Sequence, residues 1–276
     1  MALSLDRRRF LKYAIVAAVG SVLVAIPGYE LYRRWQITAQ TVTIEGRYVD
    51  LIGPPPYANM ELVGKLDTAY ELLLDLTGVR PYDGAKIGVL LDSVDSSEYQ
   101  ALAGNPITVV RHCWQELHQQ GNCCSELYHT GYHELSHDFM GIPEFDRIIF
   151  VTDEFVEGFR ALGQQYVYYH VDRPTYEEWR SAYRWPLEEY SKNQFLFEYR
   201  FDRDVCASML MDLVDRYGFD MWKRFFRNIY KLDIGPKEDR TMEERCSLFV
   251  RCVSEAAGED LTDYFKNLRF PIGPTG

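Results

Sequence analysis

Two histidines and a glutamate in this chain have the spacing of a metal site. His133, Glu134 and His137 form an H-E-x-x-H motif inside the stretch YHTGYHELSHDFM. The small and apolar neighbours suit a helix, and residues four apart on a helix are separated by only about 40° around its axis. Both imidazoles can therefore reach one ion, while Glu134 lies beside them to take a proton from water. Imidazole ligands without thiols favour zinc among the common ions.

A catalytic zinc ion needs a third protein ligand and one open position. Glu157 follows His137 with nineteen residues between them, enough for the chain to leave one helix, turn and return antiparallel. The surrounding sequence FVEGF is apolar, and a carboxylate there is costly to bury unless it meets a cation. We expect Glu157 to be the third ligand, with Glu154, one turn earlier, as the alternative ligand or as a support for the ligands. His129 is expected either to line the cleft beside the metal or to be a plain surface histidine.

The order of these residues resembles the gluzincin clan of zinc metallopeptidases, which includes the thermolysin-like and aminopeptidase families. The match consists of Thr130, His133, Glu134, Leu135, Ser136, His137, Glu157, Gly158 and Phe159. Asp138 departs from the family pattern, because an uncharged residue usually follows the second histidine. The segment at 257–265 and the tail at 270–272 look like the C-terminus of enhancin-like gluzincins, so the resemblance covers roughly residues 57–272.

The resemblance implies a zincin-like domain with one zinc ion and with Glu134 as the general base in peptide-bond hydrolysis. It also implies a tyrosine or histidine, supplied by a later helix, that donates a hydrogen bond to the developing oxyanion. The candidates are Tyr166, Tyr168, Tyr169, Tyr183, Tyr190 and Tyr199. Tyrosine is abundant in this chain, with 20 residues, so core packing is the alternative for each of them. An edge strand that borders the cleft and pairs with an extended substrate belongs to the same expectation.

The composition is that of a folded, acidic chain. Apolar residues make up 47% and charged residues 26% of the 276 positions, which excludes a disordered chain. The formal net charge is −11, and no basic stripe with interleaved aromatic residues is visible, which argues against a nucleic-acid partner. Six cysteines, an even number, permit disulfides if the chain is exported.

The N-terminus has the pattern of an export signal. The sequence DRRRFLK at 6–12 is followed by an apolar run at 13–29. The paired arginines and the Phe-Leu-Lys that follows resemble the twin-arginine signal of bacteria and archaea, with an ordinary basic flank before a membrane helix as the alternative. We expect residues 1–36 to be a retained signal anchor that holds the rest of the chain outside the cytoplasm, in the periplasm or on the cell surface of a prokaryote.

The spacing of apolar residues predicts an α+β fold that is mostly α. We expect residues 37–276 to form one domain, zincin-like by the resemblance, with a small mixed sheet and helices at 37–124 and a helical part at 125–276. Strands are predicted within 40–51, 86–91 and 107–110. A helical turn is predicted at 93–102, and helices are predicted at 58–76, 125–140, 152–170, 175–190, 200–217, 220–230, 241–257 and 261–267.

Together these features predict a membrane-anchored, zinc-dependent peptidase that hydrolyses peptide bonds of proteins or, by resemblance alone, of glycoproteins. Two alternatives stay open. In the first, the chain is a non-catalytic zinc-binding envelope protein, and in the second it hydrolyses cell-wall crosslinks with the same chemistry. The alternative to all three of these hypotheses is that the short H-E-x-x-H motif arose by chance on a solvated helix and binds no metal.

Overall fold

The computed structural model of the chain describes residues 41–55, 57–92, 101–111, 113–114, 123–141, 145, 153–192, 203–232 and 239–273, without the side chains of 123–126 and 153–154. Within these ranges no helix is both long enough and apolar enough to cross a membrane. The predicted export signal at 6–12 and the predicted anchor at 13–29 lie outside the described residues.

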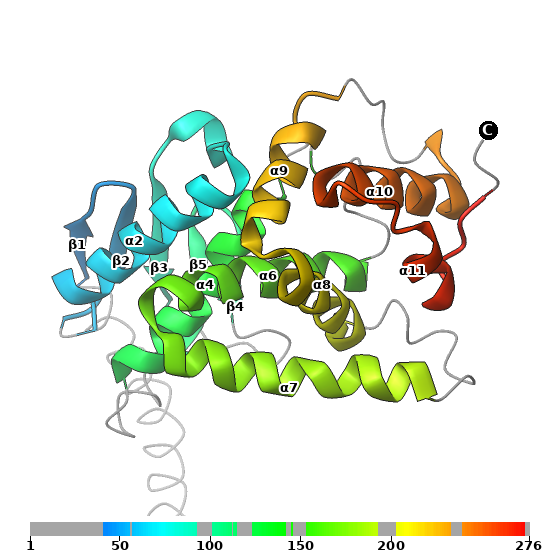
Figure 1. The fold of residues 1–276 in the computed structure, drawn as a ribbon. Coiled ribbons are helices and arrows are strands. Elements are labelled where there is room, and N and C mark those ends of the chain that lie inside the picture. Colours follow the sequence, from blue (N-terminus) through cyan, green and yellow to red (C-terminus); the bar gives the residue numbers. More distant parts are fainter. Residues whose placement is uncertain are drawn as a thin grey trace, which may run out of the picture.

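Five short strands of the described residues form one mixed sheet at one end of the molecule (Figure 1). They are β1 (Val42–Glu45), β2 (Val49–Gly53), β3 (Ile87–Leu91), β4 (Ala101–Leu102) and β5 (Ile107–Val109). Their spatial order is β1-β2-β3-β5-β4, in which β2, β3 and β5 are parallel and the two outer strands are antiparallel to their neighbours. The strands predicted within 40–51, 86–91 and 107–110 are confirmed.

Strand β4 corrects the helical turn that the sequence predicts at 93–102. Ala101 and Leu102 pair with Val109 and Thr108 of β5, so this part of the prediction is wrong, and residues 93–100 lie outside the described part. The physical reason is that β5 pairs with β3 on one side only, which leaves backbone groups on its other side without partners. Strand β4, which precedes β5 in the sequence, supplies hydrogen bonds to these groups, and a helical turn would not.

Helix α2 (Met60–Thr77) packs against the sheet and is limited by residues that stabilise helix ends. The side chain of Asn59 accepts a hydrogen bond from the Leu62 N–H at 2.9 Å, and Gly78 ends the helix in the left-handed conformation with φ of 80°. These caps satisfy backbone groups that a helix end otherwise leaves without partners. The helix predicted at 58–76 and ended by Gly78 is therefore confirmed.

Most of the remaining described residues are helical, as predicted. The helices are α4 (Cys123–Met140), α6 (Asp153–Val171), α7 (Arg173–Lys192), α8 (Arg203–Tyr217), α9 (Phe219–Ile229), α10 (Met242–Ala257) and α11 (Thr262–Asn267). A short 3-10 turn, η1 (Pro81–Gly84), connects α2 to β3. Each predicted helix is found within a few residues of its expected bounds, which confirms an α+β fold that is mostly helical.

Helix α6 lies in the middle of the helical part, between α4 and α8 (Figure 1). Two glycines allow this close approach. A Cβ added at Gly163 would lie 2.8 Å from Ser136 Oγ on α4, and one added at Gly158 would lie 2.8 Å from Cys206 Cβ on α8. Because any larger residue would push the helices apart, these glycines fix the distance between α6 and its two neighbours.

One hydrophobic core joins the sheet to the C-terminal helices, with buried residues from Val49 in β2 to Phe270 after α11. Phe159 on α6 is fully buried and lies at its centre. Its ring packs edge-on against Trp222 of α9 and Phe249 of α10, with ring centroids 5.5 and 6.0 Å apart. Residues next to Phe159 on α6 are therefore held by the core of the whole chain.

Candidate metal centre

The three predicted metal ligands come together. His133 and His137 lie one turn apart on α4, and Glu157 lies on α6, which packs against α4 (Figure 1). The two Nε2 atoms are 3.1 Å apart. Glu157 Oε2 is 3.7 Å from Nε2 of His133 and 3.9 Å from Nε2 of His137. Among the described residues this is the one group of histidine, cysteine and acidic side chains able to hold a metal ion.

The geometry fits an ion with short bonds to nitrogen and oxygen. Four ligands at the usual zinc distances of about 2.0–2.2 Å around a tetrahedron lie roughly 3.3–3.6 Å from one another. The three distances of 3.1, 3.7 and 3.9 Å bracket this range, so small side-chain movements would bring all three atoms onto one ion. The half-buried side chains of His133 and Glu157 also leave one side of the group open to solvent.

The two histidines are held in the neutral form that binds metal. Burial, together with the positive charge of Arg160, lowers the pKa of His133 from 6.5 to about 4 and that of His137 to about 2. A hydrogen bond with Gln164 opposes part of this effect at His133. Both imidazoles are thus unprotonated at neutral pH, and no proton has to leave before an ion binds.

Glu134 lies next to the ligands but takes no part in the group of three. Its side chain is only 7% exposed, and burial, with Asp138 and Glu157 nearby, raises the pKa of its carboxyl from 4.5 to about 7. The Arg160 charge acts in the opposite direction. A buried carboxyl with a pKa near the working pH can both accept and return a proton, as a general base and acid must.

Arg160 contacts the candidate site and was not among the residues expected there from the sequence. Its guanidinium donates to Oε1 of Glu157, three residues earlier on α6, in a partly buried ion pair. This contact uses one carboxylate oxygen and leaves Oε2 as the atom nearest both imidazoles. The three-residue spacing of Glu157 and Arg160 is visible in the sequence, and residues three apart on a helix are neighbours. This spacing points to the site only once Glu157 is considered as a metal ligand.

His129 does not join the three ligand atoms. Its Nδ1 contacts the Tyr168 hydroxyl, and its backbone carbonyl accepts a hydrogen bond from Gln164 at 3.0 Å. Gln164 also donates to the Tyr168 hydroxyl at 3.0 Å. His129 therefore lines the cleft beside the metal group, which is one of the two predicted roles. The side chain of Glu154, the alternative ligand, lies outside the described side chains.

Asp138, the residue that departs from the gluzincin pattern, connects helix α4 to two other segments of the chain by hydrogen bonds. Its Oδ1 accepts hydrogen bonds from the Tyr82 hydroxyl at 2.8 Å and from the Gly104 N–H at 2.9 Å. Tyr82 belongs to η1, where it and Asp83 adopt left-handed backbone angles that cost non-glycine residues energy. Asp138 is 7% exposed, so it holds both segments against α4 from inside the protein.

Of the six tyrosines predicted as oxyanion donors, Tyr183 on α7 alone is a described lining residue of the cleft. Tyr166 donates to Asp75, Tyr190 donates to the Leu268 carbonyl, and Tyr168 is engaged with His129 and Gln164. Tyr199 lies outside the described residues. Burial raises the pKa of Tyr183 to about 12, so its hydroxyl keeps its proton and stays a donor.

Two cavities flank the metal group, and we name each after a neighbouring element. The α7 cavity, of about 650 Å³, is lined by Ala101, His133, Glu134, Glu157, Trp179 and Tyr183, among others. The η1 cavity, of about 870 Å³, is lined by Arg80, Tyr82, Gly104, His137, Asp138 and Arg160, among others. The three ligands are divided between them, so the metal group lies where the two cavities approach each other.

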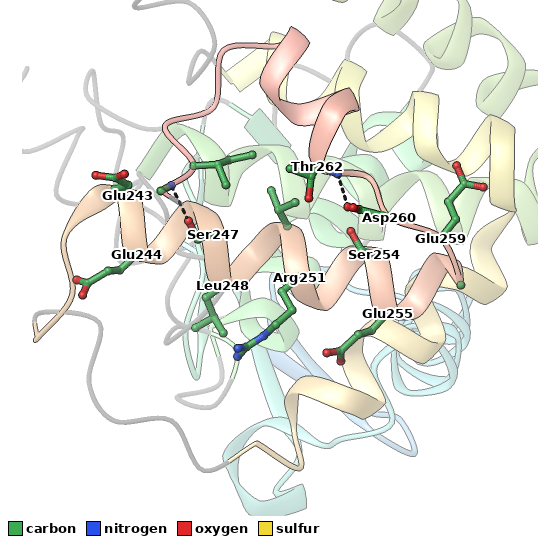
Figure 2. A pocket seen from close by; sticks show the side chains of 14 residues that line it. Glu243, Glu244, Ser247, Leu248, Arg251, Ser254, Glu255, Glu259, Asp260 and Thr262 are labelled. Carbon is green, nitrogen blue, oxygen red and sulfur yellow. Dashed lines mark hydrogen bonds between the residues drawn. The ribbon is translucent and has the colours of Figure 1, made fainter. Parts of the chain in front are cut away.

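A third cavity, of about 880 Å³, lies along α10 and the segment that follows it (Figure 2). Five of its fourteen lining residues are acidic and one is basic, namely Glu243, Glu244, Glu255, Glu259, Asp260 and Arg251. None of its lining residues is a histidine or a cysteine, and none belongs to the metal group. Exposed carboxylates of this kind are usual on an acidic protein, so this cavity gives no sign of chemistry.

Neither known protein families nor curated proteins give a match to this chain. What the chain does must therefore be inferred from the site itself, and the resemblance to gluzincins stays a resemblance between motifs.

Proposed function

We propose that the chain is a hydrolase of peptide bonds that holds a zinc ion with His133, His137 and Glu157. The observation that carries the proposal is the meeting of two neutral imidazoles and one carboxylate beside a buried glutamate, with a cavity on each side. When bound, zinc supplies a Lewis acid that polarises a carbonyl group and makes water more acidic. Nitrogen and oxygen ligands without thiols are the donor set that suits this ion.

Glu134 would move the proton in this reaction. Its carboxylate accepts a proton from the attacking water, whose oxygen forms the new bond to the peptide carbon, and it then donates that proton to the amine as the C–N bond breaks. The pKa of about 7 lets the same group take up and release a proton at neutral pH. A cation in the adjacent group would favour the ionised form, which is the form that accepts the proton.

Tyr183 and Arg160 have supporting roles in the proposal. Tyr183 lines the α7 cavity and its hydroxyl stays protonated, so we propose that it donates a hydrogen bond to the negative charge that develops on the carbonyl oxygen. Arg160 orients Glu157 through Oε1. Residues that hold a metal ligand in this way usually affect metal affinity and activity strongly.

The location that goes with this proposal is outside the cytoplasm. Its support is the sequence alone, with paired arginines at 6–12 and the apolar run at 13–29. In that case the domain would be tethered to a membrane by its N-terminus, and its substrates would be proteins or glycoproteins of the same compartment.

The test is a zinc measurement on the full-length chain, combined with a peptide hydrolysis assay. We expect one zinc ion per chain in the wild type and in Glu154→Gln, and loss of zinc in the matched variant Glu157→Gln. Glu134→Gln should keep its zinc and lose hydrolysis by about 10²–10⁴-fold, because it removes proton transfer alone.

Three results would count against the proposal. A wild-type chain that binds no zinc in metal-replete buffer contradicts the metal site. Zinc binding without cleavage of any peptide or glycoprotein in a broad panel supports the non-catalytic envelope protein instead. Hydrolysis that persists in Glu134→Gln contradicts the role of that residue.

A further inference from the structure

The segment Ala101–Gly104 runs from one flanking cavity to the other. Ala101, in the edge strand β4, lines the α7 cavity, whereas Ala103 and Gly104 line the η1 cavity. The segment therefore passes beside the metal group, and the Gly104–Asp138 hydrogen bond fixes its far end to α4. Ala101 and Leu102 are extended, and the chain bends at Gly104, so the segment turns from the edge of the sheet towards α4.

Both cavities are bordered by exposed residues. Trp179 at the α7 cavity is 41% exposed, and Tyr82 at the η1 cavity is 42% exposed. Arg203 at the first cavity and Arg80 at the second are exposed as well. Among the described residues, then, the lining of each cavity includes side chains that reach solvent, so the space on each side of the metal group opens to the surface.

We propose that the two cavities are the two halves of one substrate channel, which accepts an internal stretch of an extended polypeptide. The inference rests on the proposed function and adds to it that the enzyme is an endopeptidase. An enzyme that removes terminal residues needs a closed end and a group for the free terminus next to the metal. A channel that continues in both directions instead binds residues on both sides of the cleaved bond.

The edge strand β4 offers a way to hold such a stretch. It pairs with β5 on one side, and no described strand lies on its other side. An extended chain can add to such an edge through backbone hydrogen bonds, which are independent of its sequence. Selectivity would then come from the pockets that receive its side chains.

Each half combines aromatic and charged side chains. Trp179 and Tyr183 give the α7 cavity an aromatic wall, with Arg203 also in its lining. The lining of the η1 cavity combines charged and aromatic residues, namely Arg80, Asp83, Arg160, Tyr82 and Tyr230. Both apolar and charged side chains of a substrate could therefore find partners on either side of the cleaved bond.

The experiment compares peptides of equal sequence, with blocked or free ends, as substrates of the zinc-loaded full-length chain. We expect mass spectrometry to show cleavage of acetylated and amidated peptides at an internal bond. We also expect kcat/KM to rise at least about tenfold as residues are added on both sides of that bond, because remote contacts supply binding energy for the reaction.

Variants of the lining residues show which cavity binds the substrate residues on each side of the cleaved bond. Trp179→Ala should reduce the gain from residues on one side of the bond, and Arg80→Ala should reduce the gain from residues on the other side. The matched control is Trp185→Ala on the same helix, because Trp185 is 67% exposed and lines neither flanking cavity. It should leave the dependence on peptide length unchanged.

The two proposals can fail separately. Release of residues only from free ends, with blocked peptides left intact, overturns the channel and keeps the peptidase. If no peptide is cleaved, the proposed function fails, and the channel is then judged by the binding of blocked fluorescent peptides to the zinc-loaded Glu134→Gln chain. Binding weakened by Trp179→Ala and by Arg80→Ala, and not by Trp185→Ala, supports the channel, whereas binding that requires a free end overturns it.

Discussion

At the scale of single residues, the site depends on how each ligand is surrounded. His133 and His137 have pKa values far below 6.5 because they are buried near Arg160, and they therefore stay neutral. Glu134, which is also buried, has a raised pKa because burial disfavours its charge. Burial is thus the largest cause of both effects, with smaller contributions from the neighbouring charges: it keeps the imidazoles neutral and brings the pKa of the carboxyl close to neutral pH.

The ion pair between Arg160 and Glu157 can be tested by its effect on zinc affinity. Arg160→Ala removes the partner of Glu157 Oε1, so that the carboxylate is free to turn away from the imidazoles. We expect zinc affinity to fall by about 10–100-fold, measured by competition with a chelator of known affinity. Arg173→Ala, which removes an exposed pair with Glu177 on α7, is the control and should leave the affinity unchanged. Equal affinities in the two variants would show that Arg160 does not orient the ligand.

At the scale of elements, the site depends on the distance between α4, α6 and α8. Gly163 allows contact between α6 and α4, and Gly158, next to the ligand Glu157, allows contact between α6 and α8. Asp138 then attaches η1 and the end of the edge strand to α4. The metal group and both flanking cavities therefore share one rigid frame of helices.

The prediction at this scale compares two glycines inside helices. Gly158→Ala places a Cβ 2.8 Å from Cys206 Cβ and 3.0 Å from the backbone N of Ala207. Neither of these atoms can move without a shift of α8. We expect it to lower the free energy of unfolding by about 1–3 kcal/mol, the usual cost of overpacking. Urea unfolding of the zinc-free chain provides the measurement.

Gly64→Ala on α2 is the matched control, because no atom lies within 4 Å of an added Cβ at that position. Alanine is the better helix former, so this change should raise the free energy of unfolding by about 0.5–1 kcal/mol. If Gly158→Ala were as stable as Gly64→Ala, the close contact between α6 and α8 would be contradicted.

At the scale of the whole molecule, one core and a polar link join the N-terminal sheet region to the C-terminal helices. Asp75 on α2 accepts hydrogen bonds from the Lys223 ammonium of α9 at 2.6 Å and from the Tyr166 hydroxyl of α6 at 2.5 Å. Burial by itself would raise the pKa of Asp75, but its hydrogen bonds with Lys223 and Tyr166 lower the pKa below 3.8. Three helices far apart in the sequence thus meet at one carboxylate.

The prediction at this scale is a pH dependence of stability. Because the folded-state pKa of Asp75 is lower than its unfolded value of 3.8, its contribution is complete above that value and is lost as the pH falls through the folded-state pKa. We expect Asp75→Asn to cost about 0.2–1 kcal/mol of unfolding free energy at pH 7, as for other partly exposed pairs. The difference between wild type and variant, measured by urea unfolding, should shrink as the pH is lowered below 3.8. A difference that stays constant with pH would contradict the ionic part of this link.

Local patterns in the sequence were enough to predict every described helix longer than a single turn and the residues that could bind metal. Apolar residues at helical spacing act locally, so the positions of the helices could be predicted from the sequence to within a few residues. The H-E-x-x-H spacing likewise places two imidazoles on one helix face whatever surrounds them. Glu157 was reached by the cost of burying a carboxylate among apolar neighbours, which is again a local argument.

The contacts between distant segments could not be predicted from local patterns and follow from the fold. The pairing of Ala101 and Leu102 with β5, the bonds of Asp138 to Tyr82 and Gly104, and the two cavities around the metal group join residues that are far apart in the chain. The role proposed for Arg160 needed the fold as well, because the ion pair of Arg160 with Glu157 lies within one helix, and another helix brings the imidazoles to Glu157. Sequence spacing sets the direction of a side chain on its own helix, whereas packing between helices sets what that side chain meets.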